Sequence, residues 1–214
     1  HGDLSTLGSD VLDTINLEEP ANNSIMGPGF ALLYNDASDW VHDVYRLDLE
    51  TQETTEYVVE NPISSIQLSG SGLYAVGVTR PDDYYSYDSW ESSSRWGLSV
   101  LDMSSDNTVN LVTETEPIGV ELIENGEGSF ALVLMSGLDF LLKIDLSNPL
   151  AAEKIELPAA PISIGAMADG KFMITHDVNM GMISTLNPEK DELKSVSGFA
   201  LAGLIEEKKL PRRG

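Results

Sequence analysis

Cysteine is absent from this 214-residue sequence, which excludes disulfide bonds and thiol catalysis. Basic residues are few: 12 Lys and Arg stand against 35 Asp and Glu, which gives a net charge of −23. Because such an acidic surface repels phosphate backbones, we expect no nucleic-acid partner. No apolar run approaches the roughly 18 residues of a membrane span, so we also expect no membrane insertion.

The sequence also lacks the short motifs of common catalytic sites. It contains no GxSxG nucleophile elbow, no phosphate-binding loop and no HExxH metal motif. The "GSG" at residues 70–72 is expected to be a hairpin turn. Carboxylates are plentiful, but nothing in the sequence selects one as acid and another as base. We therefore expect no catalytic residue.

What the sequence does contain is an internal repeat. Four segments open on a proline, run through a short apolar stretch, turn at a glycine and enter a second apolar stretch. A third apolar stretch then ends on a polar residue. The prolines are Pro20, Pro62, Pro117 and Pro161; the turn glycines are Gly29, Gly72, Gly128 and Gly170; the polar end residues are Asp48, Asp102, Asp145 and Asn187. These landmarks share one period, which indicates a true repeat.

Each unit is predicted to form four short strands, rich in small, β-branched and aromatic residues and separated by Gly, Asn, Asp and Ser. In the second unit they are expected near Ile63–Leu68, Leu73–Thr79, Leu98–Met103 and Asn110–Thr115. A four-stranded unit of about 40 to 45 residues is typical of a β-propeller blade. A β-sandwich with coincidental spacing is the alternative.

The order of proline, strand, "SGSG" or "ADG" turn, strand, "VLD" or "KID" and strand resembles the YVTN-type β-propeller repeat. The Asp-Gly-Lys turn of that family is kept at Asp169-Gly170-Lys171. The resemblance implies a ring of six to eight blades. It leaves function open, because surface-layer, lactonase-like and quinoprotein-dehydrogenase-like propellers all use this repeat.

The predicted fold is therefore all-β, with about four four-stranded blades plus flanking strands. The expected divisions are a flanking segment at 1–19, blades at 20–61, 62–116, 117–160 and 161–196, and the start of a further blade with a basic tail at 197–214. Asp10–Leu17 and Ser197–Glu206 are predicted to be strands of neighbouring blades. We expect further blades, from the same polypeptide or another chain, to complete a larger ring; a self-sufficient four-bladed ring is the alternative.

The second blade carries an insertion at 80–96, between its second and third strands. The predicted topology places it on one face with the corresponding loops of the other blades, and function in repeat proteins commonly resides in such loops. Tyr and Trp suit protein or glycan recognition. The expected partner-binding residues are Tyr84, Tyr85, Tyr87, Trp90 and, from the first blade, Trp40. The alternative is a loop that packs its own rings against the propeller, as we expect of Trp96.

Acidic side chains on the same loops are weak candidates for calcium ligands. They are Asp82, Asp83, Asp88 and Glu91, with Asp36, Asp39 and Asp43. No EF-hand loop supports them, so a solvated acidic surface is the default and no other cofactor is expected. His42 and His176 are expected on this face too, but two isolated histidines rarely form a zinc site.

These observations favour a non-catalytic binding or scaffold protein that is secreted, periplasmic or attached to the cell surface. The alternative is a fragment of a lactonase-like or dehydrogenase-like propeller enzyme, whose axial site would be completed by further blades.

Overall fold

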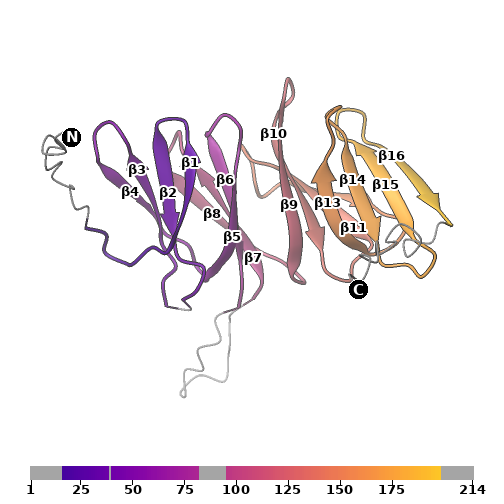
Figure 1. Ribbon diagram of the computed structural model, residues 1–214, viewed down its shortest axis with the longest axis horizontal. Coiled ribbons are helices and arrows are strands. Elements are labelled where there is room, and N and C mark those ends of the chain that lie inside the picture. The colour runs from indigo at the N-terminus through magenta and orange to yellow at the C-terminus, as the bar shows by residue number, and fades with distance from the viewer. Residues whose placement is uncertain (1–15, 39, 82–94, 199–214) are drawn as a thin grey trace, which may run out of the picture.

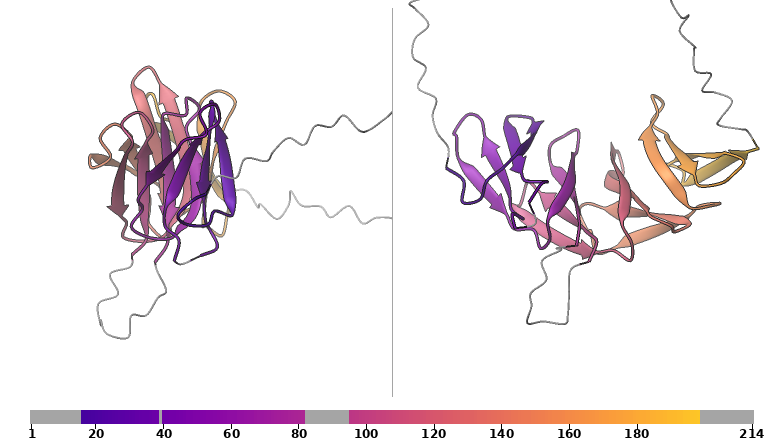
Figure 2. Two further views of the ribbon diagram at one scale, coloured as in Figure 1. Left: turned by 90° about the vertical axis from the view of Figure 1, so that its left-hand side faces the viewer. Right: turned by 60° about the horizontal axis from the view of Figure 1, so that its bottom comes forward.

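Sixteen strands form four antiparallel sheets in the computed structural model, which describes residues 16–38, 40–81 and 95–198. Each sheet is a meander in which consecutive strands are neighbours. The sheets stand side by side in chain order (Figure 1) and fan out into an open arc (Figure 2). The predicted all-β blade architecture is therefore confirmed, and the described residues contain no helix that is long and apolar enough to cross a membrane.

The strands group into four blades. Blade 1 contains β1 (Asn23–Gly27), β2 (Phe30–Tyr34), β3 (Val44–Asp48) and β4 (Thr54–Tyr57). Blade 2 contains β5 (Ile63–Leu68), β6 (Tyr74–Thr79), β7 (Gly97–Asp102) and β8 (Asn107–Val112). Blade 3 contains β9 (Pro117–Asn125), β10 (Gly128–Met135), β11 (Phe140–Asp145) and β12 (Ala152–Glu156). Blade 4 contains β13 (Pro161–Ala166), β14 (Phe172–His176), β15 (Met182–Asn187) and β16 (Glu192–Ser197).

The last strand of blade 2 begins three residues earlier than the sequence predicts, at Asn107 rather than Asn110. The cause is the tightness of the turn after β7. Asp102 accepts hydrogen bonds from the backbone N–H groups of Ser104 (2.8 Å) and Ser105 (3.3 Å). Asp106 then adopts a positive φ of 52°, so the chain reverses within four residues.

The polar landmarks of the repeat all serve this same turn. The side-chain oxygen of Asp48, Asp102, Asp145 or Asn187 accepts a hydrogen bond from the backbone N–H two residues later in every blade. The glycine landmarks have an equally local reason, because all four adopt a positive φ in the turn between the first and second strands. The repeat in the sequence is therefore a repeat of turn chemistry.

Three apolar cores lie between neighbouring blades. Leu32 of blade 1 and Leu101 of blade 2 belong to the first core, and both are fully buried. The second core joins blades 2 and 3, and the third joins blades 3 and 4 around Leu134 and Leu186. Because side chains alternate along a strand, each inner sheet buries one set of residues against the preceding blade and the other set against the following blade.

A cation on the third strand adds a polar contact between blades 1 and 2. The guanidinium of Arg46 lies 5.1 Å from the centre of the Phe30 ring. It donates a hydrogen bond to the backbone oxygen of Met103 (3.1 Å) and pairs with the Asp106 carboxylate at 3.6 Å. The Tyr57 hydroxyl donates to the same carboxylate at 3.0 Å.

Blades 3 and 4 repeat this contact at the equivalent positions. The Lys143 ammonium lies 5.2 Å from the centre of the Phe130 ring, donates to the backbone oxygen of Pro188 (3.4 Å) and pairs with Asp191 at 2.9 Å. Between blades 2 and 3 the equivalent position is Val100, a buried residue of the apolar core. The polar contact therefore supplements the packing of the blades without being required at every interface.

The two predicted flanking strands fall mainly outside the described residues. The described end of the first, Asn16 and Leu17, is not in a strand. Ser197 was expected to begin a further blade, but it is the last residue of β16, where it pairs with Met182. The rest of the second predicted strand, from residue 199 onward, lies outside the described residues.

We expect Gly170→Ala to destabilise the protein by about 1 kcal/mol, because alanine is strained at positive φ. Gly170 has a φ of +75° and nothing within 4 Å of an added Cβ, so backbone strain is the only cost. Gly126→Ala is the matched control: it also has open space and lies in a turn between first and second strands, but its φ is not positive. Urea unfolding measures both, and equal effects would contradict the turn assignment.

Candidate functional site

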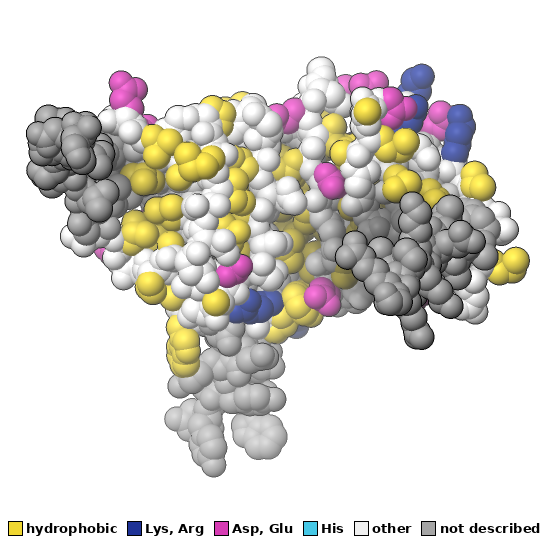
Figure 3. Space-filling view, in the orientation of Figure 1, with side chains coloured by type: hydrophobic (Ala, Val, Ile, Leu, Met, Phe, Trp, Pro, Cys, Tyr) yellow, Lys and Arg dark blue, Asp and Glu magenta, His cyan; other side chains and the backbone are white. Residues whose placement is uncertain are grey.

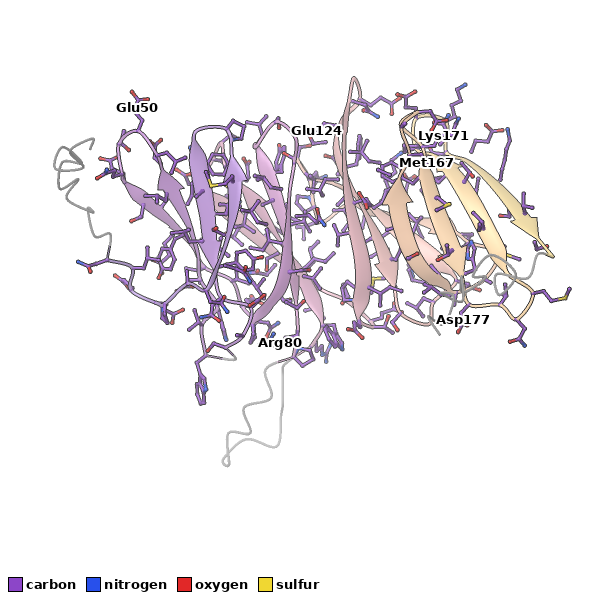
Figure 4. The ribbon with its side chains drawn as sticks, viewed as in Figure 1. Glu50, Arg80, Glu124, Met167, Lys171 and Asp177 are labelled. Atoms are coloured by element: carbon purple, nitrogen blue, oxygen red, sulfur yellow. The ribbon has the colours of Figure 1, made fainter. Side chains whose placement is uncertain are left out.

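The loops between second and third strands gather at one edge of the arc, as predicted. Figure 4 places Arg80 and Asp177, which begin two of these loops, at this edge, while Glu50, Glu124, Met167 and Lys171 lie at the opposite edge. We call this surface the loop face and define it by the described residues 35–38, 40–43, 80–81, 95–96, 136–139 and 177–181. Chain segments from all four blades thus contribute to one surface.

Both ends of the insertion in blade 2 are fastened to blade 1 or to the linker that follows it. At its start, the Arg80 guanidinium donates to the backbone oxygens of Asp36 (2.8 Å) and Ser38 (3.3 Å). At its end, the backbone oxygen of Arg95 accepts from the side-chain amide of Asn61 (3.3 Å). The start of the insertion therefore lies against the first loop of the loop face, and its end lies against the linker between blades 1 and 2.

That first loop is itself held by a network of amide and carboxylate groups. The side-chain amides of Asn22 and Asn23 donate to the two Asp36 carboxylate oxygens at 3.0 and 2.6 Å. The Asp36 backbone N–H donates back to the Asn22 side chain at 3.1 Å. Asn35 caps the next turn by accepting from the backbone N–H groups of Ala37 and Ser38. The loop is thus ordered before Trp40 is reached.

Trp40, predicted to bind a partner, presents 65% of its surface to solvent. Its backbone N–H donates to the Ser38 hydroxyl, the residue whose backbone oxygen binds Arg80. The neighbouring Val41 is buried, which anchors this stretch to the blade. Met180, on the blade 4 loop of the same face, is also 69% exposed. The loop face therefore offers large apolar side chains from its first and last loops.

Three carboxyl groups interact at the end of the first loop: Glu19, Asp43 and Glu56. Burial, a hydrogen bond with Glu56 and the nearby negative charges of Glu19 and Glu56 raise the pKa of Asp43 to about 6, against a smaller opposing effect of His42. Glu19 also accepts from the His42 backbone N–H at 3.3 Å. This part of the surface therefore takes up a proton in mildly acidic solution.

Most of the other predicted site residues lie outside the described residues. They are the partner-binding candidates Tyr84, Tyr85, Tyr87 and Trp90 and the calcium candidates Asp39, Asp82, Asp83, Asp88 and Glu91. Of the remaining acids, Asp36 has both carboxylate oxygens engaged by asparagines, and Asp43 shares a proton-binding pair with Glu56. No group of three His, Asp or Glu side chains is placed to hold a metal ion within the described ranges.

The expected position of His176 is wrong. His176 is the last residue of β14, only 1% exposed, and belongs to the interior of blade 4. Its Nδ1 lies 2.8 Å from the backbone oxygen of Ala159, and its Nε2 lies 2.7 Å from the hydroxyl of the buried Ser184. Because a carbonyl oxygen can only accept, Nδ1 donates to Ala159, while Nε2 shares a hydrogen bond with the Ser184 hydroxyl. Both ring nitrogens are engaged, so His176 cannot join His42 in a metal site.

Two features of the loop face have no signature in the sequence. Arg80 follows a strand as an ordinary polar residue, and only the arrangement of blades 1 and 2 shows that it binds the loop of the preceding blade. The Asp43–Glu56 pair depends on the pairing of β3 with β4, in which Tyr45 lies opposite Glu56. In contrast, Trp96 is half-buried beside the start of β7, as a structural role predicts.

Comparisons with known proteins show the fold alone. No protein-family model and no curated protein matches the sequence. Among solved structures, the chain is similar to the hydrazine synthase of Kuenenia stuttgartiensis (TM-score 0.50, 16% identity), covering 79% of this chain and 46% of that one. It is also similar to the dihydro-heme d1 dehydrogenase NirN in complex with DHE (TM-score 0.52, 10% identity), covering 83% and 36%. Both are β-propeller proteins, and this chain spans less than half the length of either.

We expect Asp43→Asn to stabilise the protein at pH 7 by about 1 kcal/mol, allowing for solvent screening of a half-exposed group. The pKa of Asp43 is raised on folding, so the folded state keeps its proton while the unfolded state releases it. The free energy of unfolding of the wild type therefore decreases as the pH rises from about 4 to 6, and the Asp43→Asn variant does not show this decrease. Asp177→Asn, which removes one exposed carboxylate from the same face, controls for net charge. Denaturant unfolding at pH 4 and 7 that finds the same difference at both would contradict the prediction.

Proposed function

We propose that this chain is a non-catalytic binding or scaffold module that contacts a protein or glycan through its loop face. Trp40 and the insertion at 80–96 form the contact element, with Tyr84, Tyr85, Tyr87 and Trp90 as its aromatic residues. Aromatic side chains of this kind provide rigid, amphipathic contact area at low entropic cost.

The observation that carries the proposal is the fastening of the insertion. Arg80 and Asn61 tie its two ends to blade 1 and to the linker after it, beside an exposed Trp40. The described start of an insertion that the repeat does not need for folding is thereby held against the loop that carries Trp40, the most exposed aromatic ring among the described residues. Such placement favours recognition over a loop without a role.

The charge of the surface limits the partner. Residues 1–116 contain 21 acidic and 3 basic residues, so this part of the chain, which includes the insertion and Trp40, carries 18 of the 23 net negative charges. A basic partner, or a neutral glycan that stacks on aromatic rings, fits this surface better than an anionic one. Calcium could bridge an acidic partner through Asp82, Asp83, Asp88 and Glu91, but the described residues give no support for it.

The setting proposed for this module is extracellular, periplasmic or at the cell surface, within a larger ring. The Asp169-Gly170-Lys171 turn and the repeat landmarks support a YVTN-type propeller, a repeat that surface proteins share. The length of the two similar structures supports further blades, in the same polypeptide or in another chain.

A second candidate function is that of a propeller enzyme of the lactonase-like or dehydrogenase-like kind. The observation in its favour is that the two similar structures are both enzymes by name, a hydrazine synthase and a dihydro-heme d1 dehydrogenase. Their identity to this chain is too low for an activity to be transferred. Turnover of a lactone or of a reducible dye only by the completed ring would favour this candidate.

Replacing 81–95 with a short Gly-Ser link tests the binding role. Stability should change by no more than about 1–2 kcal/mol, because loop-closure entropy depends weakly on length and Arg80 is kept. Binding should be lost. Wild-type and trimmed proteins are immobilised and compared on a glycan array and in cell-surface extract, with bound proteins quantified by mass spectrometry.

Two further variants sharpen this comparison. Trp40→Ala should weaken whatever the wild type binds by at least tenfold, since an exposed aromatic at the centre of an interface commonly contributes 2 kcal/mol or more. Glu50→Gln, at the opposite edge of the arc, should leave binding unchanged (Figure 4). Equal retention of ligands by the wild-type and trimmed proteins would show that the insertion is not the contact element.

A further inference from the structure

A groove lies on the concave side of the arc, and none of its lining residues belongs to the loop face. The first strands of the blades face the viewer in Figure 1 and line the inside of the arc in Figure 2. Side chains of both polar and apolar type are exposed on this side (Figure 3). Where β5, β9 and β13 approach one another, they enclose a groove of about 320 Å³. This volume is at the lower end of the range for small-molecule sites, which is roughly 300–1,000 Å³.

The groove has one polar wall and one apolar wall with a single carboxylate. Ser64, Ser65 and Gln67 line it from β5. Ile118 and Glu121 line it from β9, and Ile164 from β13. A site that combines hydroxyl and amide groups, an aliphatic surface and one charge is suited to an elongated ligand with a charged end.

Local irregularities of the strands form the opening. The pairing of β5 with β6 shifts register between Ile63 and Ser65, which leaves Ser64 as an extra residue. The pairing of β9 with β10 shifts between Leu134 and Met135, which leaves Ile118 unpaired in the same way. Bulges re-aim side chains and end regular pairing. Both bulged residues, Ser64 and Ile118, line the groove, so the backbone conformation of blades 2 and 3 contributes to its shape.

Glu121 is the unusual group in this groove. No hydrogen bond or ion pair reaches its carboxylate from the described residues, and burial raises its pKa. Glu124, three residues along the same strand, is the contrast, because the Ser71 backbone N–H donates to it at 2.7 Å and the Ser71 hydroxyl donates to it as well. Burial raises the pKa of Glu124, but these hydrogen bonds outweigh burial and lower it. A partly buried carboxylate without a partner is costly unless a ligand supplies one.

We propose that this groove binds a primary alkylammonium group, with the ammonium on Glu121 and its carbon chain along Ile118 and Ile164. Glu121 pairs with Leu132 across β9 and β10, so its side chain lies on the face of blade 3 that is turned toward Ile164 and blade 4. A lysine side chain and a free aliphatic amine both carry this group. The ammonium supplies the hydrogen bonds and the opposite charge that Glu121 lacks, and the acidic protein concentrates cations around it. The site is independent of the loop face and of the function proposed for it.

Titration of the full 214-residue chain with n-butylamine, followed by NMR chemical-shift changes, tests this inference. Saturable shifts should be centred on the amides of β9 and β13. n-Butanol, which has the same shape without the charge, should bind at least tenfold more weakly. Nα-acetyl-lysine methylamide distinguishes the sources: tighter binding than n-butylamine assigns the groove to a peptide lysine, and weaker binding assigns it to a free amine.

Two variants and one control complete the design. Glu121→Gln removes the charge, and Ile164→Ala removes the apolar surface beside it without changing the charge. The first should weaken n-butylamine binding at least tenfold, and the second at least threefold. Glu127→Gln removes the same charge from the exposed tip of the β9–β10 hairpin and should leave binding within twofold. Binding of n-butylamine that Glu121→Gln leaves unchanged, or that Glu127→Gln weakens equally, would overturn the proposal.

Discussion

Burial of both faces of each sheet is the constraint on which this structure depends. A four-stranded meander cannot cover its own apolar side chains, so blades 2 and 3 are stable only between neighbours. Leu132 and Leu134 face blade 4, while Ala131 and Val133 face blade 2, and all four are fully buried. Burying each large side chain contributes about 1.5–3 kcal/mol. No described residue of another blade covers the side of blade 4 that faces away from blade 3, and Met173 and Val196 are 42% and 65% exposed there.

This constraint leaves the ends of the strands free for function. Packing occupies the faces of the sheets and turn chemistry occupies one edge of the arc, so the loop face can vary without loss of the core. The insertion at 80–96 uses that freedom, and Arg80 at its start binds the loop of blade 1. The concave side is variable for another reason: the first strand of each sheet pairs on one side only, so bulges such as that at Ile118 are tolerated.

The blades could be predicted from sequence because their signals are local. Asp102 and Gly72 determine turns through their own neighbours in the chain, and the spacing of such residues repeats. Contacts between blades could not be predicted in the same way. The pairing of Lys143 with Asp191 joins residues 48 positions apart and requires the register of two sheets to be known. His176 was misplaced because a polar residue after an apolar strand predicts a loop, whereas here Ser184 and the Ala159 carbonyl satisfy it inside the blade.

Hydrogen–deuterium exchange tests the dependence of each blade on its neighbours most directly. The comparison is between central strand pairs, β10 with β11 in blade 3 and β14 with β15 in blade 4, since all of these amides lie within a sheet. The account predicts markedly slower exchange in β10 and β11, because within the described part of the chain blade 3 is covered on both faces and blade 4 on one. Equal protection of the two pairs would show that a covering neighbour is not what stabilises a blade, and would contradict the account.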